Sequence, residues 1–118
     1  TAAAHWDRHG FGLWALRTRD GEFAGWAGIR HAAIDGVQEF ELLYTFKREF
    51  WGRGLASEIA AALVGIAWSR LGAPSLVALV VAGNGASCRV LEKSGFARER
   101  SMLSRGEEVA VYRLLPNS

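Results

Sequence analysis

The sequence has a single cysteine, Cys88, among its 118 residues. One cysteine excludes an intrachain disulfide and a zinc site built from cysteine pairs, which favours a reducing compartment. The sequence also lacks any run of about 20 apolar residues, the length that a membrane-spanning helix needs. Its N-terminal residues do not show the basic and then apolar order of a signal peptide. These absences predict a cytoplasmic protein with no membrane segment.

Metal-binding motifs and a strong excess of one charge are also missing. His5, His9 and His31 form no spacing such as HExxH, so we interpret them as surface or structural residues and predict no metal cofactor. Fourteen Lys and Arg stand against twelve Asp and Glu, and the basic residues are scattered without a run of five. That pattern is typical of a solvated surface, and it gives little support to a nucleic-acid partner.

What is present fits one compact domain over residues 1–118, since 50% of the residues are apolar and 22% are charged. Periodicity and turn residues predict an α/β (α+β) fold, in which a mixed sheet carries helices on its faces. The expected elements are the end of a helix over 2–9, strands over 13–17, 23–30 and 37–46, a helix over 54–71, a strand over 75–81, a helix over 84–93, and a final hairpin over 96–104 and 107–115.

The strand expected over 37–46 has a clear alternation. Phe40, Leu42 and Tyr44 alternate with Glu39 and Glu41. Because successive side chains of a strand point to opposite faces, the two carboxylates should project from one face. They are candidates for a general base, although two charges on a solvated sheet face would give the same pattern.

The segment after this strand predicts an anion site. Gly52 and Gly54 lie where a strand must turn into a helix, and the first helical turn leaves N–H groups unpaired. The glycines could instead serve only a tight turn. The segment matches neither a Walker loop nor a dinucleotide-binding motif. The candidate donors and flanking residues are Gly52, Arg53, Gly54, Leu55, Ala56 and Ser57.

Two separated motifs resemble one enzyme family. Residues 51–58 (WGRGLASE) resemble the cofactor loop of the GNAT (Gcn5-related) N-acetyltransferases, and most resemble the RimJ/RimL-like branch. The loop departs from the usual pattern at Trp51, where Gln or Arg is common. Residues 84–96 (NGASCRVLEKSGF) resemble that branch's Asn-x-x-Ser…Glu-Lys-x-Gly-Phe signature. The resemblance extends from about residue 12 to residue 115.

The resemblance implies a mostly antiparallel twisted sheet and a direct transfer of acetyl from acetyl-CoA to a primary amine. It implies that the backbone of Tyr44, Thr45 and Phe46 pairs with the pantetheine arm where the sheet splays open. It also implies that the loop from 52 to 57 takes the pyrophosphate, with Arg53 adding a charged contact. Asn84 would bond the pantetheine or the end of the preceding strand, or would act only as an ordinary N-cap.

The resemblance also assigns the chemistry. Ser87 would protonate the departing sulfur, and Glu41 would be the base that takes a proton from the amine, with Glu39 on the same face. Cys88 is expected to be a small buried residue without a covalent role.

Members of the family generally begin with a strand and one or two helices, whereas this sequence opens at the expected end of that helical segment. The sequence therefore predicts a domain truncated at its N-terminus or a minimal variant of the fold. The acceptor, a protein N-terminus or a small-molecule amine, is left open, and so is a homodimer. One alternative function is a non-catalytic acyl-CoA-binding or regulatory domain. A third is a basic RNA-associated module, suggested by the sequence pI of 9.1.

Overall fold

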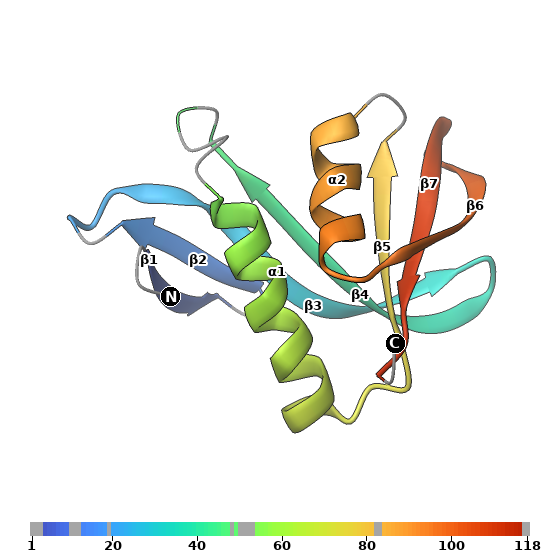
Figure 1. Cartoon of the computed structure of the whole chain (residues 1–118), viewed down its shortest axis with the longest axis horizontal. Coiled ribbons are helices and arrows are strands. Elements are labelled where there is room, and N and C mark those ends of the chain that lie inside the picture. Colours follow the sequence, from blue (N-terminus) through green and yellow to red (C-terminus); the bar gives the residue numbers. More distant parts are fainter. Residues whose placement is uncertain are drawn as a thin grey trace.

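The computed structural model describes residues 4–9, 13–18, 20–47, 49, 54–81 and 84–116. Among these residues seven strands form one sheet in the order β1-β2-β3-β4-β5-β7-β6. Figure 1 shows the sheet with the two helices in front of it. The elements are β1 (Ala4–His9), β2 (Leu13–Thr18), β3 (Phe23–Ile34), β4 (Val37–Phe46), α1 (Leu55–Ile66), the π-helical turn η2 (Ala67–Leu71), β5 (Leu76–Val81), α2 (Gly85–Lys93), β6 (Ala97–Ser104) and β7 (Glu107–Leu114).

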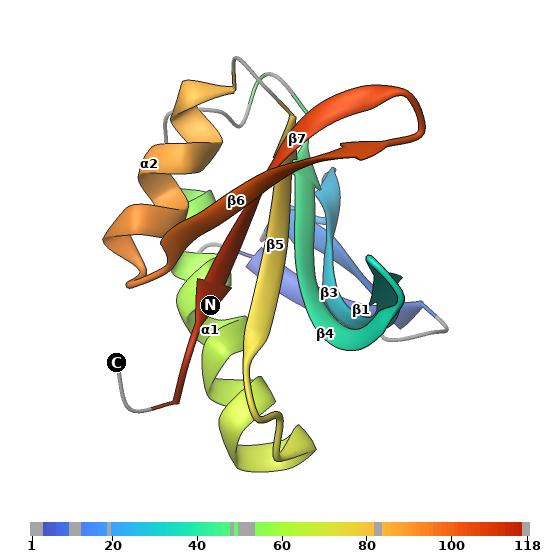
Figure 2. The same cartoon turned by 90° about the vertical axis from the view of Figure 1, so that its right-hand side faces the viewer.

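All neighbouring strands of the sheet run antiparallel except β4 and β5, which run parallel. Figure 2, turned by 90°, shows α1 and α2 on the same face of the sheet. The predicted fold class, a mixed and mostly antiparallel sheet flanked by helices, is confirmed.

Residues 2–9 were expected to end a helix, and this prediction is wrong. Ala4–His9 is strand β1, which pairs antiparallel with β2 from Ala4 opposite Thr18 to His9 opposite Leu13. Six residues are too few to hold a helix alone, whereas the free edge of β2 supplies partners for their backbone groups.

Two tight turns position the long strands as the sequence predicts. Asp35 and Gly36 join β3 to β4 with φ angles of 51° and 79°, and Arg105 and Gly106 join β6 to β7 with φ angles of 51° and 80°. Two consecutive positive φ angles are the geometry of a type I′ hairpin turn, whose twist matches that of the strands.

The main core lies between the helices and the sheet. Leu55, Ile59 and Leu63 recur at four-residue spacing on α1 and are buried against the sheet. Leu42 of β4 and Tyr112 of β7 are buried in the same cluster. Even-numbered positions of β4 therefore face the helices, and Glu39 and Glu41 face the opposite side of the sheet.

Candidate functional site

Strands β4 and β5 separate soon after they meet. Their only residue pair in the sheet is Glu41 opposite Val77. Beyond Glu41, Tyr44, Thr45 and Phe46 pair on one side with β3, and none of them has a partner in β5. The splay expected at this point is confirmed, and it leaves one edge of β4 without a strand neighbour among the described residues.

Gly54 sets the start of α1 next to this edge. It is the N-cap in a left-handed conformation, φ 75° and ψ 3°, and a Cβ placed there would have no atom within 4 Å. The first hydrogen bond of the helix runs from the Glu58 N–H to the Gly54 carbonyl, 3.1 Å. The N–H groups of residues 55–57 precede it and have no acceptor within the helix. Of the predicted loop, Gly52 and Arg53, like Trp51, lie outside the described residues.

Asn84 caps the second helix. Its Oδ1 accepts a hydrogen bond from the Ser87 N–H at 3.1 Å, and its carbonyl accepts another from the Cys88 N–H at 3.2 Å. The N-cap role, one of the two alternatives for Asn84, is confirmed, whereas its contact with a cofactor stays a prediction. The cap fixes the first turn of α2 and with it the position of Ser87.

The side chain of Ser87 points toward β4. Its Oγ lies 3.0 Å from the phenol oxygen of Tyr44, and either atom could be the donor. Burial raises the pKa of Tyr44 above its ordinary value, while the hydrogen bond with Ser87 acts in the opposite direction. The sequence predicted a role only for the backbone of Tyr44, and the phenol was missed. Its even-numbered position on β4, shared with Leu42, was the available signal, because it places the ring under the helices.

Cys88 and a second tyrosine lie beside this pair. The Tyr112 phenol is 3.4 Å from Glu92 Oε2, and its hydrogen bond with Cys88 is the largest of the effects that raise the pKa of Tyr112 to about 12. Cys88 itself is half-buried rather than buried. The expected absence of a covalent role for Cys88 stays a prediction.

The two carboxylates of β4 are not solvated surface charges. The Glu41 side chain is 8% exposed, and its Oε1 accepts a hydrogen bond from Nε of Arg30, its cross-strand neighbour, at 3.0 Å. The Glu39 side chain is 13% exposed and pairs with Arg113. In the described part of the chain, every fully buried side-chain oxygen has a hydrogen-bond partner. Oε2 of Glu41 has no partner there, so this oxygen keeps some contact with solvent.

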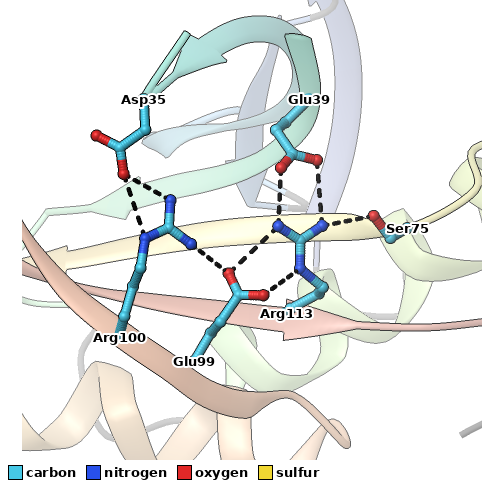
Figure 3. A network of polar contacts seen from close by, with 6 residues as sticks. All are labelled: Asp35, Glu39, Ser75, Glu99, Arg100 and Arg113. Atoms are coloured by element: carbon cyan, nitrogen blue, oxygen red, sulfur yellow. Dashed lines mark hydrogen bonds and ion pairs between the residues drawn. The ribbon is translucent and has the colours of Figure 1, made fainter. Parts of the chain in front are cut away.

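Arg113 of β7 is the centre of a network of ion pairs (Figure 3). Its guanidinium donates two hydrogen bonds to the Glu39 carboxylate, 3.1 and 2.7 Å long. It also donates to Ser75 at 2.8 Å and to Glu99 at 2.9 Å. The pKa of Arg113 is raised, first by Glu39, and that of Glu99 is lowered, first by Arg113. Arg113 therefore joins β4, β6 and β7 on the face opposite the helices.

A second arginine extends the network to the turn between β3 and β4. Arg100 of β6 donates to Asp35 Oδ2 from Nε at 3.2 Å and from Nη2 at 2.8 Å, and it also contacts Glu99 (Figure 3). We call Asp35, Glu39, Ser75, Glu99, Arg100 and Arg113 the ionic clamp. The clamp engages both carboxylate oxygens of Glu39, whereas Arg30 contacts only Oε1 of Glu41.

The described residues contain no group of three His, Cys, Asp or Glu side chains that could hold a metal ion. In the same part of the chain, neither helix is long and apolar enough to cross a membrane.

Comparison with known proteins identifies the family. Residues 1–97 match the family model described as an acetyltransferase (GNAT) domain. The chain belongs to this family. It is 35% identical over 105 residues to the uncharacterized protein YkkB of Bacillus subtilis, and 34% identical over 99 residues to the uncharacterized N-acetyltransferase YoaA of the same organism. These matches cover 88% and 83% of the chain but 61% and 55% of the relatives, so the chain spans little more than half of their length.

Solved GNAT structures share the fold. A putative GNAT-family acetyltransferase from Bordetella pertussis matches 86% of this chain and 64% of its own, at a TM-score of 0.77 and 25% identity. An acetyltransferase from Agrobacterium tumefaciens matches 87% of this chain and 60% of its own, at a TM-score of 0.74 and 32% identity. The ribosomal-protein-S5-alanine acetyltransferase of Vibrio fischeri matches 90% of this chain and 62% of its own, at a TM-score of 0.78. Its identity of 12% supports the fold alone.

Proposed function

We propose that this chain transfers the acetyl group of acetyl-CoA to a primary amine by direct attack of the amine on the thioester. The observation that carries the proposal is that three features meet at one end of the sheet: the part of β4 beyond its pairing with β5, the start of α1 and the start of α2 (Figure 1). Membership of the GNAT family supports the same reaction.

The described residues fit acetyl-CoA. The amides of a pantetheine arm can pair with the backbone of Tyr44, Thr45 and Phe46, on the side of β4 away from β3, in the manner of an added strand. The open space over Gly54 lets a phosphate approach the backbone, and the N–H groups of residues 55–57 carry the partial positive charge of a helix N-terminus.

In the proposed reaction a bond forms between the amine nitrogen and the acetyl carbon, and the bond from that carbon to sulfur breaks. Ser87 donates its hydroxyl proton to the sulfur. Glu41 receives the proton that the amine loses. Glu41 lies three residues before Tyr44, roughly 10 Å along the strand, so the proton reaches its carboxylate through water. Ser87 and Glu41 lie on opposite faces of β4. The amine therefore loses its proton on one face of the strand, and the sulfur receives its proton on the other.

The pyrophosphate site is tested by Gly54→Asp with Gly54→Asn as the matched control. Both side chains tolerate the left-handed conformation of residue 54 and have nearly the same size, so they differ mainly in charge. We expect Asp to weaken acetyl-CoA binding by more than about 2 kcal/mol, roughly thirtyfold, and Asn to weaken it much less. Equal affinities of the two folded variants, measured by calorimetry, would remove the pyrophosphate from this position.

Turnover separates an enzyme from an acyl-CoA-binding domain. The amine panel should contain a peptide that begins with alanine and a polyamine, because proteins of the same fold are named as a ribosomal-protein-S5-alanine acetyltransferase and a spermidine N-acetyltransferase. Free CoA is measured with a thiol reagent. Amine-dependent release of CoA supports the proposal, whereas tight binding of acetyl-CoA without release supports a non-catalytic domain.

Ser87→Ala tests the proton donor. Protonation of the sulfur matters only as charge develops during transfer, so kcat should fall while the affinity for acetyl-CoA changes little. A loss of affinity with kcat preserved at saturation would make Ser87 a binding contact instead.

A further inference from the structure

The hydrogen bond between Tyr44 and Ser87 joins two hydroxyl groups that are both held in place. Ser87 is fixed by the cap that Asn84 makes with its N–H. The Tyr44 ring is half-buried and packs beside Phe46, with ring centroids 5.9 Å apart. The two oxygens lie 3.0 Å apart, and the contact joins β4 to α2 at the end of the sheet where the strands separate.

Counting protons decides which hydroxyl must be the donor. Each has one hydrogen and can also accept a hydrogen bond. If Ser87 donates to Tyr44, its only proton is directed at the phenol and cannot reach a sulfur atom. If Tyr44 donates to Ser87, the proton of Ser87 is free to point away from the ring. Donation of a proton by Ser87 therefore requires Tyr44 to be the donor in this pair.

We propose that Tyr44 is a positioning residue that orients the hydroxyl of Ser87 and supplies, through Ser87, the proton that the departing thiolate receives. The inference rests on the proposed acetyl transfer. As the bond from carbon to sulfur breaks, its electron pair remains on sulfur. The Ser87 proton moves to that sulfur, and the Tyr44 proton moves to Ser87 Oγ. Tyr44 is left as a phenolate, which takes a proton from water before the next turnover.

The acidities of the groups favour this route. A transfer is most efficient when the donor and acceptor have similar pKa values. A serine alcohol acting alone is a far weaker acid than a thiol, whose pKa is about 8.5 in cysteine, whereas the ordinary pKa of a tyrosine phenol is 10.0. Burial and the neighbouring Cys88 raise the pKa of Tyr44, which keeps its phenol protonated at neutral pH.

Kinetics of single and double variants test the coupling. The substitution Tyr44→Phe keeps the ring and removes only the hydroxyl, so we expect kcat to fall about tenfold to a hundredfold while the KM for acetyl-CoA stays within about twofold. Adding Tyr44→Phe to Ser87→Ala should cost little more, because both act on one proton. Unchanged kcat in Tyr44→Phe, or losses that multiply in the double variant, would overturn the inference.

The pH profile distinguishes a proton source from a packing residue. The chain has two tyrosines, so fluorotyrosine incorporated biosynthetically into Tyr112→Phe occupies residue 44 alone. Activity is full while the phenol is protonated and is lost as the pH rises through its pKa. That pKa lies above 10.0 in the native chain, and fluorination lowers it. The alkaline limb of kcat should therefore move to lower pH together with the phenolate absorbance. A limb that does not move would overturn the proposal.

A binding measurement separates this inference from the proposed function, because it needs no acceptor. CoA and desulfo-CoA are titrated by calorimetry between about pH 7 and pH 10, across the titration of a thiol. If the pair donates a proton to sulfur, the affinity for CoA should rise with pH relative to desulfo-CoA, and Tyr44→Phe should lose much of that rise. This result without turnover of any amine would refute acetyl transfer but support the donor pair. Equal pH dependence of the affinities for CoA and desulfo-CoA would overturn the donor pair.

Discussion

Replacing Arg113 by methionine removes the cation at the centre of the ionic clamp and keeps much of its aliphatic volume. The variant leaves the Glu39 side chain, 13% exposed, without its two hydrogen bonds. A fully buried charge that loses its partner costs about 3–5 kcal/mol. Because Arg113 is itself 23% exposed and solvent can reach both groups, we expect a loss of about 2–3 kcal/mol in the free energy of unfolding.

Urea unfolding at neutral pH measures this loss. Arg70→Met is the matched control, because Arg70 is exposed on η2 and should change stability by less than about 0.5 kcal/mol. Combining Arg113→Met with Glu39→Gln should recover part of the loss, since it removes the unpaired charge. A loss in Arg113→Met no larger than in Arg70→Met would refute the view that the clamp holds the two halves of the sheet together.

The pH dependence of the free energy of unfolding tests the same ion pairs. Arg113 lowers the pKa of Glu99 below its ordinary 4.5 in the folded chain. A lowered pKa contributes stability above the unfolded pKa, and this contribution is lost as the pH falls through the folded pKa. The difference between the native chain and Arg113→Met should therefore be constant near neutrality and shrink below about pH 4.5. A difference that grows in acid would contradict the assigned ion pair.

Three further outcomes follow from local geometry. Gly25→Ala should destabilise the fold by more than about 2 kcal/mol in urea unfolding, because its Cβ would lie 2.1 Å from the Thr45 carbonyl oxygen. Asn84→Ala should lower the free energy of unfolding by about 1 kcal/mol, whereas Asn84→Asp keeps the cap. A loss of acetyl-CoA affinity in the Asp variant, whose cap is intact, would reveal a cofactor contact. Glu41→Gln should lower turnover on the order of a hundredfold and flatten the acidic limb, while Glu107→Gln, an exposed carboxylate on β7, should not.

Elements defined by local patterns could be predicted from the sequence. The strand over 37–46 has the predicted bounds, and the apolar spacing from Leu55 to Leu63 identifies the buried face of α1. The loop and helix motifs predicted the helix start at Gly54 and the helix that carries Ser87, because each motif is continuous in the chain; the roles of both residues in the site stay predictions. β1 was missed because a short polar strand depends on the edge of β2, and no pattern within six residues records that dependence.

The side-chain partners could not be predicted, because they join residues far apart in sequence. Arg113 and Glu39 are 74 positions apart, Arg100 and Asp35 are 65 apart, and Tyr44 and Ser87 are 43 apart. Their contacts depend on strand register and on the angle between the two parts of the sheet. The alternation of the strand placed Glu39 and Glu41 on one face, and only the family resemblance favoured Glu41 as the base. The register distinguishes them, since it places Glu39 in the clamp and Glu41 beside the half-exposed Arg30.

The alternation of β4 explains why the proposed proton donor and base can serve one reaction without sharing a side of the sheet. Tyr44 occupies an even position under α2, and Glu41 occupies an odd position on the other face. A shift of one residue in the pairing of β3 with β4 would exchange these faces and place a carboxylate under the helices. The Asp35–Gly36 turn and the contact between Glu39 and Arg113 both fix that register. The ionic clamp therefore contributes to the site although none of its members lies beside Ser87, and loosening it should impair transfer before it unfolds the chain.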